Sequence, residues 1–439
     1  MTRHVLSVLD GVSRVGRVGY ESRDEIFSFE YDPHWGGLPQ SYSISPHILV
    51  AGQPAPSSTV RRFLENLLPE GRALDIVSTT HQVSKNNIYG LVRELGQETS
   101  GALSFLPENA ESLPRGSIRR EISRGELGQR IDERAQVPFM VWDGRVRMSI
   151  AGYQDKLAVY FQGDELYLVE GELASTHILK PEPSESRLPG LVANEHFCMS
   201  LAARLGLVVA RVSILRLPEP VLVIERFDRV REAERVRRLH IIDACQALDF
   251  PVSYKYERNF GSGRDVRQIR DGVSFARLFS LAEYTVQKAV TRLALLRWAL
   301  FNYLIGNSAA HGKNISFFCR RDGLWLAPCY DLVSVAQYDG IDHELAMAYG
   351  DEFLLPAITP FQWADFAHGT GTARPLLARE MRRIGKSALA AAAKQAAGPI
   401  YADNERKLVD GISTLVQNQA RKLIEMAAPM LQVDSSLLR

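Results

Sequence analysis

Alternating apolar and polar residues characterise the first part of the chain. Residues 4–9 (HVLSVL) precede an Asp-Gly pair, and the alternation returns through Val18. Two such stretches joined by Asp-Gly predict a β-hairpin. A helix is predicted over residues 59–68, because residues 67–71 (LLPEG) form a stop signal. We therefore expect a small mixed α/β unit in this part of the chain.

Short apolar stretches joined by tight turns follow from about residue 145. Strands are predicted over residues 146–150, 156–161, 166–169 and 176–180. The simplest arrangement for the first three of these strands is an antiparallel meander, and residues 176–180 are a further strand. A helix over residues 192–205 is expected to end at Gly206, and the β-branched stretch 220–225 (PVLVIE) predicts a buried strand.

The pattern becomes mostly helical after about residue 240. Long helices are predicted over residues 286–304, 375–397 and 404–427. The sequence therefore predicts an α+β fold, with a β-rich N-terminal lobe, an added small α/β subdomain and a mainly helical C-terminal lobe. The expected boundaries are 1–107 for the subdomain, 108–235 for the N-lobe and 236–439 for the C-lobe.

Composition narrows the class of protein. A chain of 439 residues is long enough for two or three packed units. Its 46% hydrophobic and 23% charged residues are typical of a globular protein. With 52 Lys and Arg against 51 Asp and Glu, the net charge of +1 argues against a protein that coats nucleic acid by charge alone.

The lack of a predicted targeting signal and the spacing of the cysteines favour a cytoplasmic protein. The first residues lack the unbroken apolar segment of a secretory signal, and no apolar stretch is long enough to predict a membrane span. The four cysteines show no CxxC spacing, so neither a zinc site nor a disulfide framework is expected. We expect no membrane partner and a reducing compartment.

Candidate chemistry lies in residues 307–314 (NSAAHGKN), between a long apolar helix and an apolar strand. An Asp322-Gly323 pair separates this strand from a second apolar stretch, which predicts a hairpin with that pair at the turn centre. Arg321 would then face Leu324.

Extending this register places Asn314 opposite Asp331. Directly paired residues have Cβ atoms about 5 Å apart, so the amide and the carboxylate could share one cation. Magnesium prefers a few hard oxygen ligands together with phosphate oxygens. The sequence therefore predicts a magnesium site at Asn314 and Asp331.

The spacing also matches the catalytic loop of protein kinases, in which a catalytic Asp lies five residues before a metal-binding Asn. Here Ala309 occupies the Asp position and Asn314 the Asn position, with His311 between them. The alternative interpretation is a plain polar turn formed by His311, Lys313 and Asn314.

Two further features support a nucleotide site. Lys180 ends a mostly apolar strand, and Glu195 is the acid on an otherwise apolar helix face. A strand Lys paired with a helix Glu fixes the ATP phosphates in kinases. The loop 148–156 (MSIAGYQDK) could present backbone N–H groups to phosphate. An ordinary hairpin, and an unrelated surface Lys with a snorkelling Glu, remain the alternatives.

Several motifs in order resemble the HipA family of bacterial toxin kinases, from residue 1 to about 430. They include residues 149–156 (SIAGYQDK), 224–229 (IERFDR), 305–314, 328–331 (PCYD) and, in the first unit, 66–71 (NLLPEG). The resemblance implies a two-lobed, protein-kinase-like fold that uses ATP and Mg²⁺.

The resemblance also assigns roles to individual positions. A loop over the nucleotide phosphates would consist of Ala151, Gly152, Tyr153, Gln154, Asp155 and Lys156. Lys180 would contact the phosphates, while Glu225 and Phe227 would offer hinge backbone groups to adenine. His311 and Asn314 would belong to the catalytic loop, with Asn314 and Asp331 as metal ligands. Ser149 corresponds to the autophosphorylation site of the family.

The departure at Ala309 affects the expected activity, because the family carries a catalytic Asp there. Without that carboxylate, phosphoryl transfer should fall by several orders of magnitude, while nucleotide and metal binding persist. Because Lys180, Asn314 and Asp331 are intact, we favour a deliberate inactivating substitution over a natural pseudokinase.

The resemblance implies a serine/threonine-protein kinase toxin that acts on a protein substrate, with an aminoacyl-tRNA synthetase as the expected class. It also implies a helix-turn-helix antitoxin as partner and, through that complex, operator DNA. The alternative function is a non-catalytic corepressor, for which Arg379, Arg382 and Arg383 on a C-terminal helix could touch phosphates. A small-molecule phosphotransferase is a third possibility, disfavoured by the order of the motifs.

Overall fold

The computed structural model describes residues 3–108, 117–147, 154–171, 173–183, 187–232 and 235–438. The chain divides into two compact units. Unit 1 comprises Met1–Ser184, Leu215–Val252 and Ser316–Ala327, and unit 2 comprises Glu185–Ile214, Ser253–Ile315 and Pro328–Arg439. Each unit is therefore assembled from segments that are distant in sequence.

A four-stranded antiparallel sheet opens unit 1, in the order β3-β2-β1-β4. Its strands are β1 (Arg3–Asp10), β2 (Ser13–Glu21), β3 (Ile26–Tyr31) and β4 (Leu103–Pro107). The predicted hairpin is confirmed, because Asp10 pairs with Ser13 around Gly11, whose φ is 58°. Glycine adopts this left-handed conformation without steric cost.

Three helices accompany this sheet in sequence: α1 (Ser57–Glu65), α2 (Gly71–His81) and α3 (Ile88–Leu95). The helix predicted to reach residue 68 ends at Glu65, since the N–H groups of Leu67 and Leu68 bond to carbonyls three residues back in a tighter turn. Asn87 caps α3 by accepting a hydrogen bond from Gly90 N at 2.9 Å.

A six-stranded sheet forms the second layer of unit 1, in the order β11-β12-β10-β8-β9-β5. Its strands are β5 (Ser117–Ile122), β8 (Leu157–Gln162), β9 (Glu165–Gly171), β10 (His177–Pro181), β11 (Val212–Leu217) and β12 (Glu219–Glu225). Helix α4 (Arg124–Asp132) packs Leu127 against Leu157, Leu179 and Val221 of this sheet. The predicted antiparallel meander is wrong in part. The hairpin of β8 and β9 is present, but the strand at Arg145–Val146 pairs with Val141–Trp142 in a separate two-stranded sheet. Asp143 and Gly144, with φ of 52° and 71°, close that local turn. Residues 148–150 of this expected strand lie outside the described residues.

Smaller strands complete unit 1. They are β6 (Val141–Trp142), β7 (Arg145–Val146), β13 (Arg229–Glu232), β14 (Arg235–Arg238), β15 (Ile241–Asp243), β16 (Ser316–Arg320) and β17 (Gly323–Leu326), with the short helix α6 (Ala244–Ala247). The last three strands form a sheet in the order β15-β16-β17.

The register predicted for the β16-β17 hairpin is wrong. Arg320 pairs with Gly323 and Phe317 with Leu326, so the turn residues are Arg321 and Asp322. Gly323 has a φ of 129°, a conformation that favours glycine at the first position after the turn. The Asp322 carboxylate accepts a hydrogen bond from the Trp325 indole at 3.1 Å. These two local preferences move the turn centre by one residue, so each residue of β16 pairs two positions earlier in β17 than predicted.

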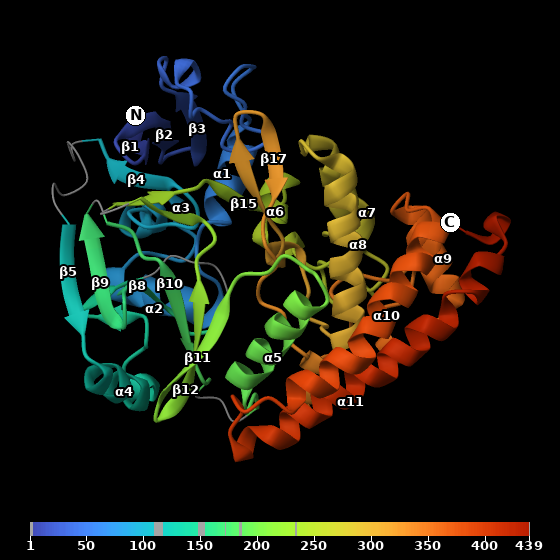
Figure 1. The fold of residues 1–439 in the computed structure, drawn as a ribbon. Coiled ribbons are helices and arrows are strands. Elements are labelled where there is room, and N and C mark those ends of the chain that lie inside the picture. The colour runs from blue at the N-terminus through green and yellow to red at the C-terminus, as the bar shows by residue number, and fades with distance from the viewer. Residues whose placement is uncertain are drawn as a thin grey trace. The chain divides into compact units, whose positions relative to one another are not determined.

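Unit 2 is mainly helical (Figure 1). Its helices are α5 (Leu191–Arg204), α7 (Phe275–Ser280), α8 (Lys288–Ile305), α9 (Pro360–Gly369), α10 (Arg374–Ala396) and α11 (Asp403–Met426). Figure 1 shows α10 and α11 side by side, and α8 lies near both. The predicted long helices are confirmed within two residues, and Gly206 follows α5 with a φ of 83° as expected.

Short 3-10 turns link these elements. They are η1 (Trp35–Gly37), η2 (Glu133–Ala135), η3 (Val252–Tyr254), η4 (Leu281–Tyr284), η5 (Gly312–Asn314), η6 (Val335–Gln337), η7 (Leu355–Ala357), η8 (Pro429–Gln432) and η9 (Ser435–Leu437). Within the described ranges, no helix combines the length and the apolar character that crossing a membrane requires.

Candidate active site

The loop that carries position 309 begins where α8 ends in unit 2. Gly306 ends the helix with a φ of 61°, a left-handed conformation that suits glycine. The Asn307 side chain donates to Asn302 Oδ1 at 2.8 Å and accepts from Ala309 N at 3.1 Å. Ala309 itself is exposed, whereas Asn307 and Ser308 are buried. The loop is therefore held by the hydrogen bonds of Asn307, and the side chain of Ala309 does not contribute to holding it.

The predicted pair of metal ligands is in contact within unit 2. Asn314 Nδ2 donates a hydrogen bond to Asp331 Oδ2 at 2.9 Å, and Asn314 Oδ1 accepts one from His311 N at 3.0 Å. Asn314 is buried, and Asp331 is partly exposed. The juxtaposition inferred from sequence is thus present, although the strand register from which it was inferred is wrong.

The contact arises from the conformation of the chain around Asp331. Its φ of 58° is uncommon for a residue other than glycine, and Asp and Asn are enriched among the exceptions. Cys329 is fixed by backbone bonds to Val208 and Ala210, at 2.8 and 2.9 Å. The Tyr330 hydroxyl donates to Lys313 O at 2.6 Å. These contacts place the Asp331 carboxylate beside η5 without a continuous ladder.

The chemistry of this pair fits a magnesium ion. A carboxylate and an amide both offer hard oxygen atoms, and magnesium in kinases takes its remaining ligands from phosphate and water. Within the described residues, no group of three or more His, Cys, Asp and Glu side chains could hold a metal ion. Asn314 and Asp331 therefore remain the metal candidates, and their role as ligands stays a prediction.

The residues expected to contact the nucleotide lie in unit 1. Lys180 is buried in β10, opposite Leu222 of β12. Gln154 donates from its side chain to Pro181 O at 3.0 Å, and Lys156 is buried at the start of β8. Burial raises the pKa of the Asp155 carboxyl. Ser149, Ala151, Gly152 and Tyr153 lie outside the described residues.

The expected ion pair between Lys180 and Glu195 stays a prediction. Lys180 belongs to unit 1, and Glu195 is a buried residue of α5 in unit 2. A buried Glu on an apolar helix face needs a partner, because an isolated buried charge is costly.

The residues expected to form the hinge lie at the end of β12 and directly after it. Glu225 is the last residue of the strand and is exposed, and the Phe227 ring contacts the Phe318 ring edge-on, with centroids 6.0 Å apart. The next residues form a buried ionic network that the sequence analysis missed. Asp228 Oδ2 accepts from Arg226 Nη2 at 2.8 Å and from Arg229 Nη1 at 2.7 Å.

This network, defined here as Glu98, Arg226, Asp228 and Arg229, connects the hinge to the N-terminal segment of unit 1. Gly101 N donates to Asp228 at 2.9 Å, and the Glu98 carboxylate lies 3.6 Å from Arg226 and 3.7 Å from Arg229. Burial alone would raise the pKa of Asp228, but Arg226 and Arg229 hold it well below its usual value. Burial lowers the pKa of Arg229 to about 9, so its guanidinium is still charged at neutral pH.

The only sequence signal for this network was the alternation of charges directly after a buried strand, in residues 224–229. Two Arg flanking one Asp at that place indicate a buried ion pair more than a solvated surface, because the preceding strand is buried. The position of Glu98 could not be inferred, since it is distant in sequence.

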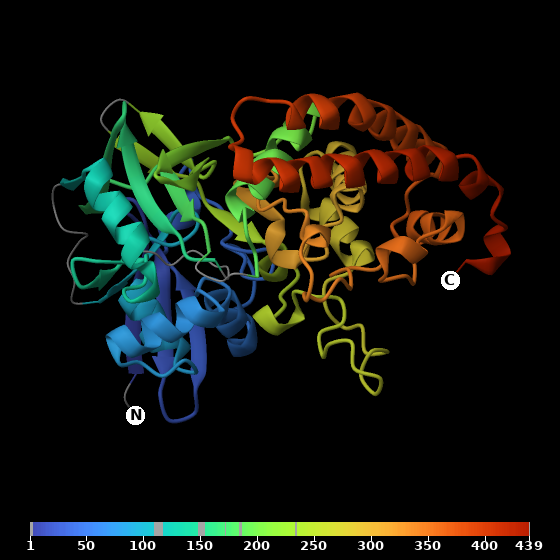
Figure 2. The same cartoon turned by 90° about the horizontal axis from the view of Figure 1, so that it is seen from below.

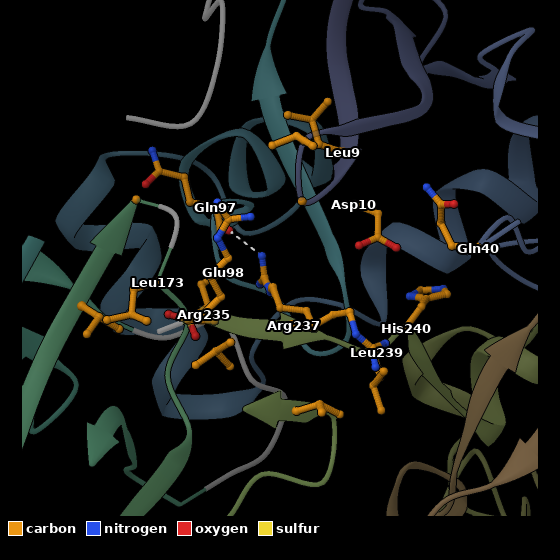
Figure 3. Close-up of a pocket in the computed structure, with 18 of the residues that line it drawn as sticks. Leu9, Asp10, Gln40, Gln97, Glu98, Leu173, Arg235, Arg237, Leu239 and His240 are labelled. Atoms are coloured by element: carbon orange, nitrogen blue, oxygen red, sulfur yellow. Dashed lines mark hydrogen bonds between the residues drawn. The ribbon is translucent and has the colours of Figure 1, made fainter. Parts of the chain in front are cut away.

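A pocket lined by both charged and apolar residues of unit 1 lies beside this network (Figure 3). Figure 3 shows Asp10, Glu98, Arg237 and His240 among its lining residues. None of the predicted site residues that the structure describes lines it. His240 is 2% exposed, and burial lowers its pKa to about 4, so the imidazole is neutral at pH 7.

The basic cluster on α10 is partly neutralised. Arg383 Nε donates to Glu380 at 2.8 Å, and Arg297 bonds to the same carboxylate at 2.9 Å. The Arg379 side chain is exposed, with Nε 3.9 Å from Glu380. The cluster therefore presents fewer uncompensated charges than its sequence indicates.

Position 309, Asn314 and Asp331 have the spacing and the contact of a protein-kinase catalytic and metal-binding segment. Comparison with known proteins supports this class. Residues 148–396 match the family described as HipA-like C-terminal domain, and residues 6–106 match the HipA N-terminal domain.

A relative from Shewanella oneidensis, named serine/threonine-protein kinase toxin HipA, is 43% identical over 375 residues, covering 85% of this chain and 84% of the relative. A solved structure described as the Shewanella oneidensis MR-1 toxin-antitoxin system HipA, HipB and operator DNA complex is also similar. Its TM-score is 0.88 at 38% identity, covering 98% of this chain and 100% of that chain. The chain belongs to the HipA family, and by family it is a serine/threonine-protein kinase. The predicted α+β class is confirmed.

Proposed function

We propose that this chain is an ATP- and Mg²⁺-dependent serine/threonine kinase toxin whose catalytic carboxylate is missing at Ala309. The observation that carries the proposal is the contact between Asn314 and Asp331. Asn314 lies five residues after position 309, which is exposed. The proposal is supported by membership of a kinase family and by the donor types of the pair.

Each set of residues has its own task in this proposal. The backbone of Glu225 and Phe227 would bind adenine, and Lys180 with the loop 151–156 would bind the phosphates. Asn314 and Asp331 would hold Mg²⁺, which neutralises charge on the phosphates when bound. Ser149 would be the autophosphorylation site, where added negative charge competes with that of ATP.

Ala309 determines the activity that we expect. A methyl group cannot accept a proton from the substrate hydroxyl, so general-base catalysis is lost. The exposed Ala309 side chain takes no part in holding the loop, which explains how the surrounding geometry persists. We favour a deliberate substitution over natural decay, because the remaining motif residues are intact.

Restoring the carboxylate tests the proposal. We expect Ala309→Asp to raise phosphoryl transfer from labelled ATP by about 10²–10⁴-fold, as general-base groups commonly do. The measurement is transfer to Ser149 and to purified aminoacyl-tRNA synthetases in the presence of Mg²⁺, followed by phosphopeptide mapping. Ala309→Asn is the matched control, since it has nearly the same shape without the charge and should stay inactive. A restored chain that binds ATP but labels no protein would show the proposal to be wrong.

We further infer the partners of the kinase. The similar solved structure is described as a complex of HipA with HipB and operator DNA. By analogy, this chain would bind a helix-turn-helix antitoxin and, through it, operator DNA. The substrate class, an aminoacyl-tRNA synthetase, rests on the family resemblance. Action in the cytoplasm agrees with four free cysteines, three of them buried.

A non-catalytic corepressor is the second candidate function, and the same complex favours it. In this case the chain would strengthen antitoxin binding to operator DNA whether or not Ala309 is replaced. Gel-shift titration of operator DNA with the antitoxin, with and without this chain, measures the effect. No change in antitoxin affinity would count against this function and leave the kinase proposal standing.

A further inference from the structure

A long segment without helix or strand lies between η3 and α7 in unit 2. It covers residues 255–274, all of which the structure describes. Figure 2 shows it as a yellow-green loop that extends away from the helices of unit 2. Irregular segments longer than about 12–15 residues are uncommon in compact domains, and ordered ones are usually functional.

The start of this segment is attached to the catalytic loop. Gly312 N donates a hydrogen bond to Lys255 O at 2.9 Å, and the Tyr256 ring meets the His311 ring edge-on, with centroids 5.1 Å apart. Because both His311 and Gly312 lie within five residues of Asn314, the segment starts beside the proposed site of phosphoryl transfer.

The base of the segment is rigid. Glu257 is 3% exposed, and its carboxylate accepts from Ala348 N and from Arg270 Nε, both at 2.8 Å. Arg258 and Arg270 lie over the Phe353 ring, at 3.8 and 5.1 Å from its centroid. These contacts join the two ends of the segment.

Close packing of the backbone fixes the base further. A Cβ added at Gly272 would lie 1.8 Å from Tyr256 O, so no other residue fits there. Gly272 N also donates to Glu257 O at 3.2 Å. Because the base is rigid, a molecule bound to the outer part of the segment would be held at a fixed position relative to the catalytic loop.

The tip, defined here as residues 259–269, has a different character. Phe260 is 59% exposed, and Arg264 and Arg267 are exposed. Neither arginine forms an ion pair with another residue in the part of the chain that the structure describes. An exposed Phe beside two uncompensated Arg resembles the composition of protein interfaces, in which aromatic and Arg side chains are enriched.

We propose that the tip docks the protein substrate of the kinase, through a folded surface that offers carboxylates to Arg264 and Arg267 and an apolar depression to Phe260. The inference rests on the proposed function and extends it to substrate selection. Five residues of chain span at most about 18 Å, so Phe260 lies within that reach of Lys255 and hence near the catalytic loop. A nucleic acid fits less well, because two Arg and one Asp give the tip a small net charge, whereas binding to a phosphate backbone relies on many cationic side chains.

The test uses the Ala309→Asp chain with three changes at the tip: Phe260→Ala, Arg264→Glu and Arg267→Glu. Phosphorylation is measured against purified aminoacyl-tRNA synthetases, one at a time, together with self-labelling at Ser149. We expect the KM for the synthetase to rise at least tenfold, with the KM for ATP and self-labelling unchanged. The matched control carries Leu431→Ala, Arg421→Glu and Lys422→Glu, which make the same types of change at exposed positions distant in sequence.

The outcomes separate the two proposals. An unchanged KM for the synthetase overturns docking at the tip and leaves the kinase function intact. Loss of self-labelling as well assigns the tip to the architecture of the catalytic loop and also overturns docking. A chain that labels itself but no synthetase refutes the substrate class and the docking inference with it. If the tip changes instead abolish binding of purified tRNA, the partner is a nucleic acid and the proposal is wrong.

Discussion

At the scale of single residues, Asp331 combines an unusual backbone conformation with the predicted metal-binding side chain. Its φ of 58° lies in the left-handed region, and its carboxylate contacts Asn314. Backbone strain that persists at such a place is often functional, because the surrounding structure must hold it. The neighbouring bond from Tyr330 to Lys313 O provides one of these constraints.

Asp331→Asn separates the charge of this residue from its conformation. Asn tolerates the left-handed region nearly as well as Asp, so we expect a change in stability below about 1 kcal/mol. Loss of the carboxylate should weaken Mg²⁺-dependent ATP binding at least tenfold. Calorimetric titration of ATP with and without Mg²⁺ measures this effect. If the substitution leaves the Mg²⁺ dependence of binding unchanged, Asp331 is not a metal ligand.

At the scale of elements, the buried ionic network joins the residues after β12 to the loop that precedes β4. Arg226 and Arg229 both bond to Asp228, whose carboxylate also accepts from Gly101 N. Removing one partner from a buried network leaves other charges uncompensated, which usually costs more than the intact network contributes. The backbone after β12 is thus held both by contacts between sequence neighbours and by the distant bond from Gly101.

We expect Asp228→Asn to lower the free energy of unfolding by about 3–5 kcal/mol, since two buried Arg lose their nearest counter-charge and keep only the more distant Glu98. Because the folded pKa of Asp228 is depressed, its contribution is present above about pH 4 and is lost as the pH falls further. Urea unfolding at pH 7 measures the change. Arg237→Gln is the control, because its ion pair with Glu232 is exposed and should contribute at most about 1 kcal/mol. Equal effects of the two changes would contradict the role of the network.

At the scale of the whole molecule, His240 links the stability of the fold to pH. Its Nε2 lies 3.0 Å from Ile44 O, which requires Nε2–H as the donor, and its ring stacks on Tyr42 at 4.9 Å. Burial lowers the pKa of His240 to about 4, compared with 6.5 for a free side chain. The unfolded chain therefore binds a proton at a pH where the folded chain does not.

We expect this difference to destabilise the fold as the pH falls from about 6.5 to about 4, by about 3 kcal/mol in total. His240→Gln can still donate to Ile44 O but carries no charge, so its unfolding free energy should change less over this range. Denaturant unfolding at a series of pH values compares the two chains. The same pH dependence in both would exclude His240 as the source.

The sequence by itself determined the class of the fold and the identity of the candidate site residues. Periodic burial of neighbouring positions is a local property of the chain. It predicts the long helices α8, α10 and α11 and the hairpin of β8 and β9. The spacing from Ala309 to Asn314 is likewise local, so the sequence alone indicates kinase chemistry.

Only the tertiary structure decided the register of β16-β17, the contact of Asn314 with Asp331, and the bond from Gly101 N to Asp228. The register depended on the φ of Gly323 and on the hydrogen bond from the Trp325 indole to Asp322. Turn statistics alone do not predict either of these features. Glu98 and Arg226 lie close together although they are far apart in sequence. A buried charge needs an opposite charge nearby, and the fold determines which residue supplies it. Such pairings depend on three-dimensional proximity, which the periodic pattern of apolar residues along the chain does not indicate.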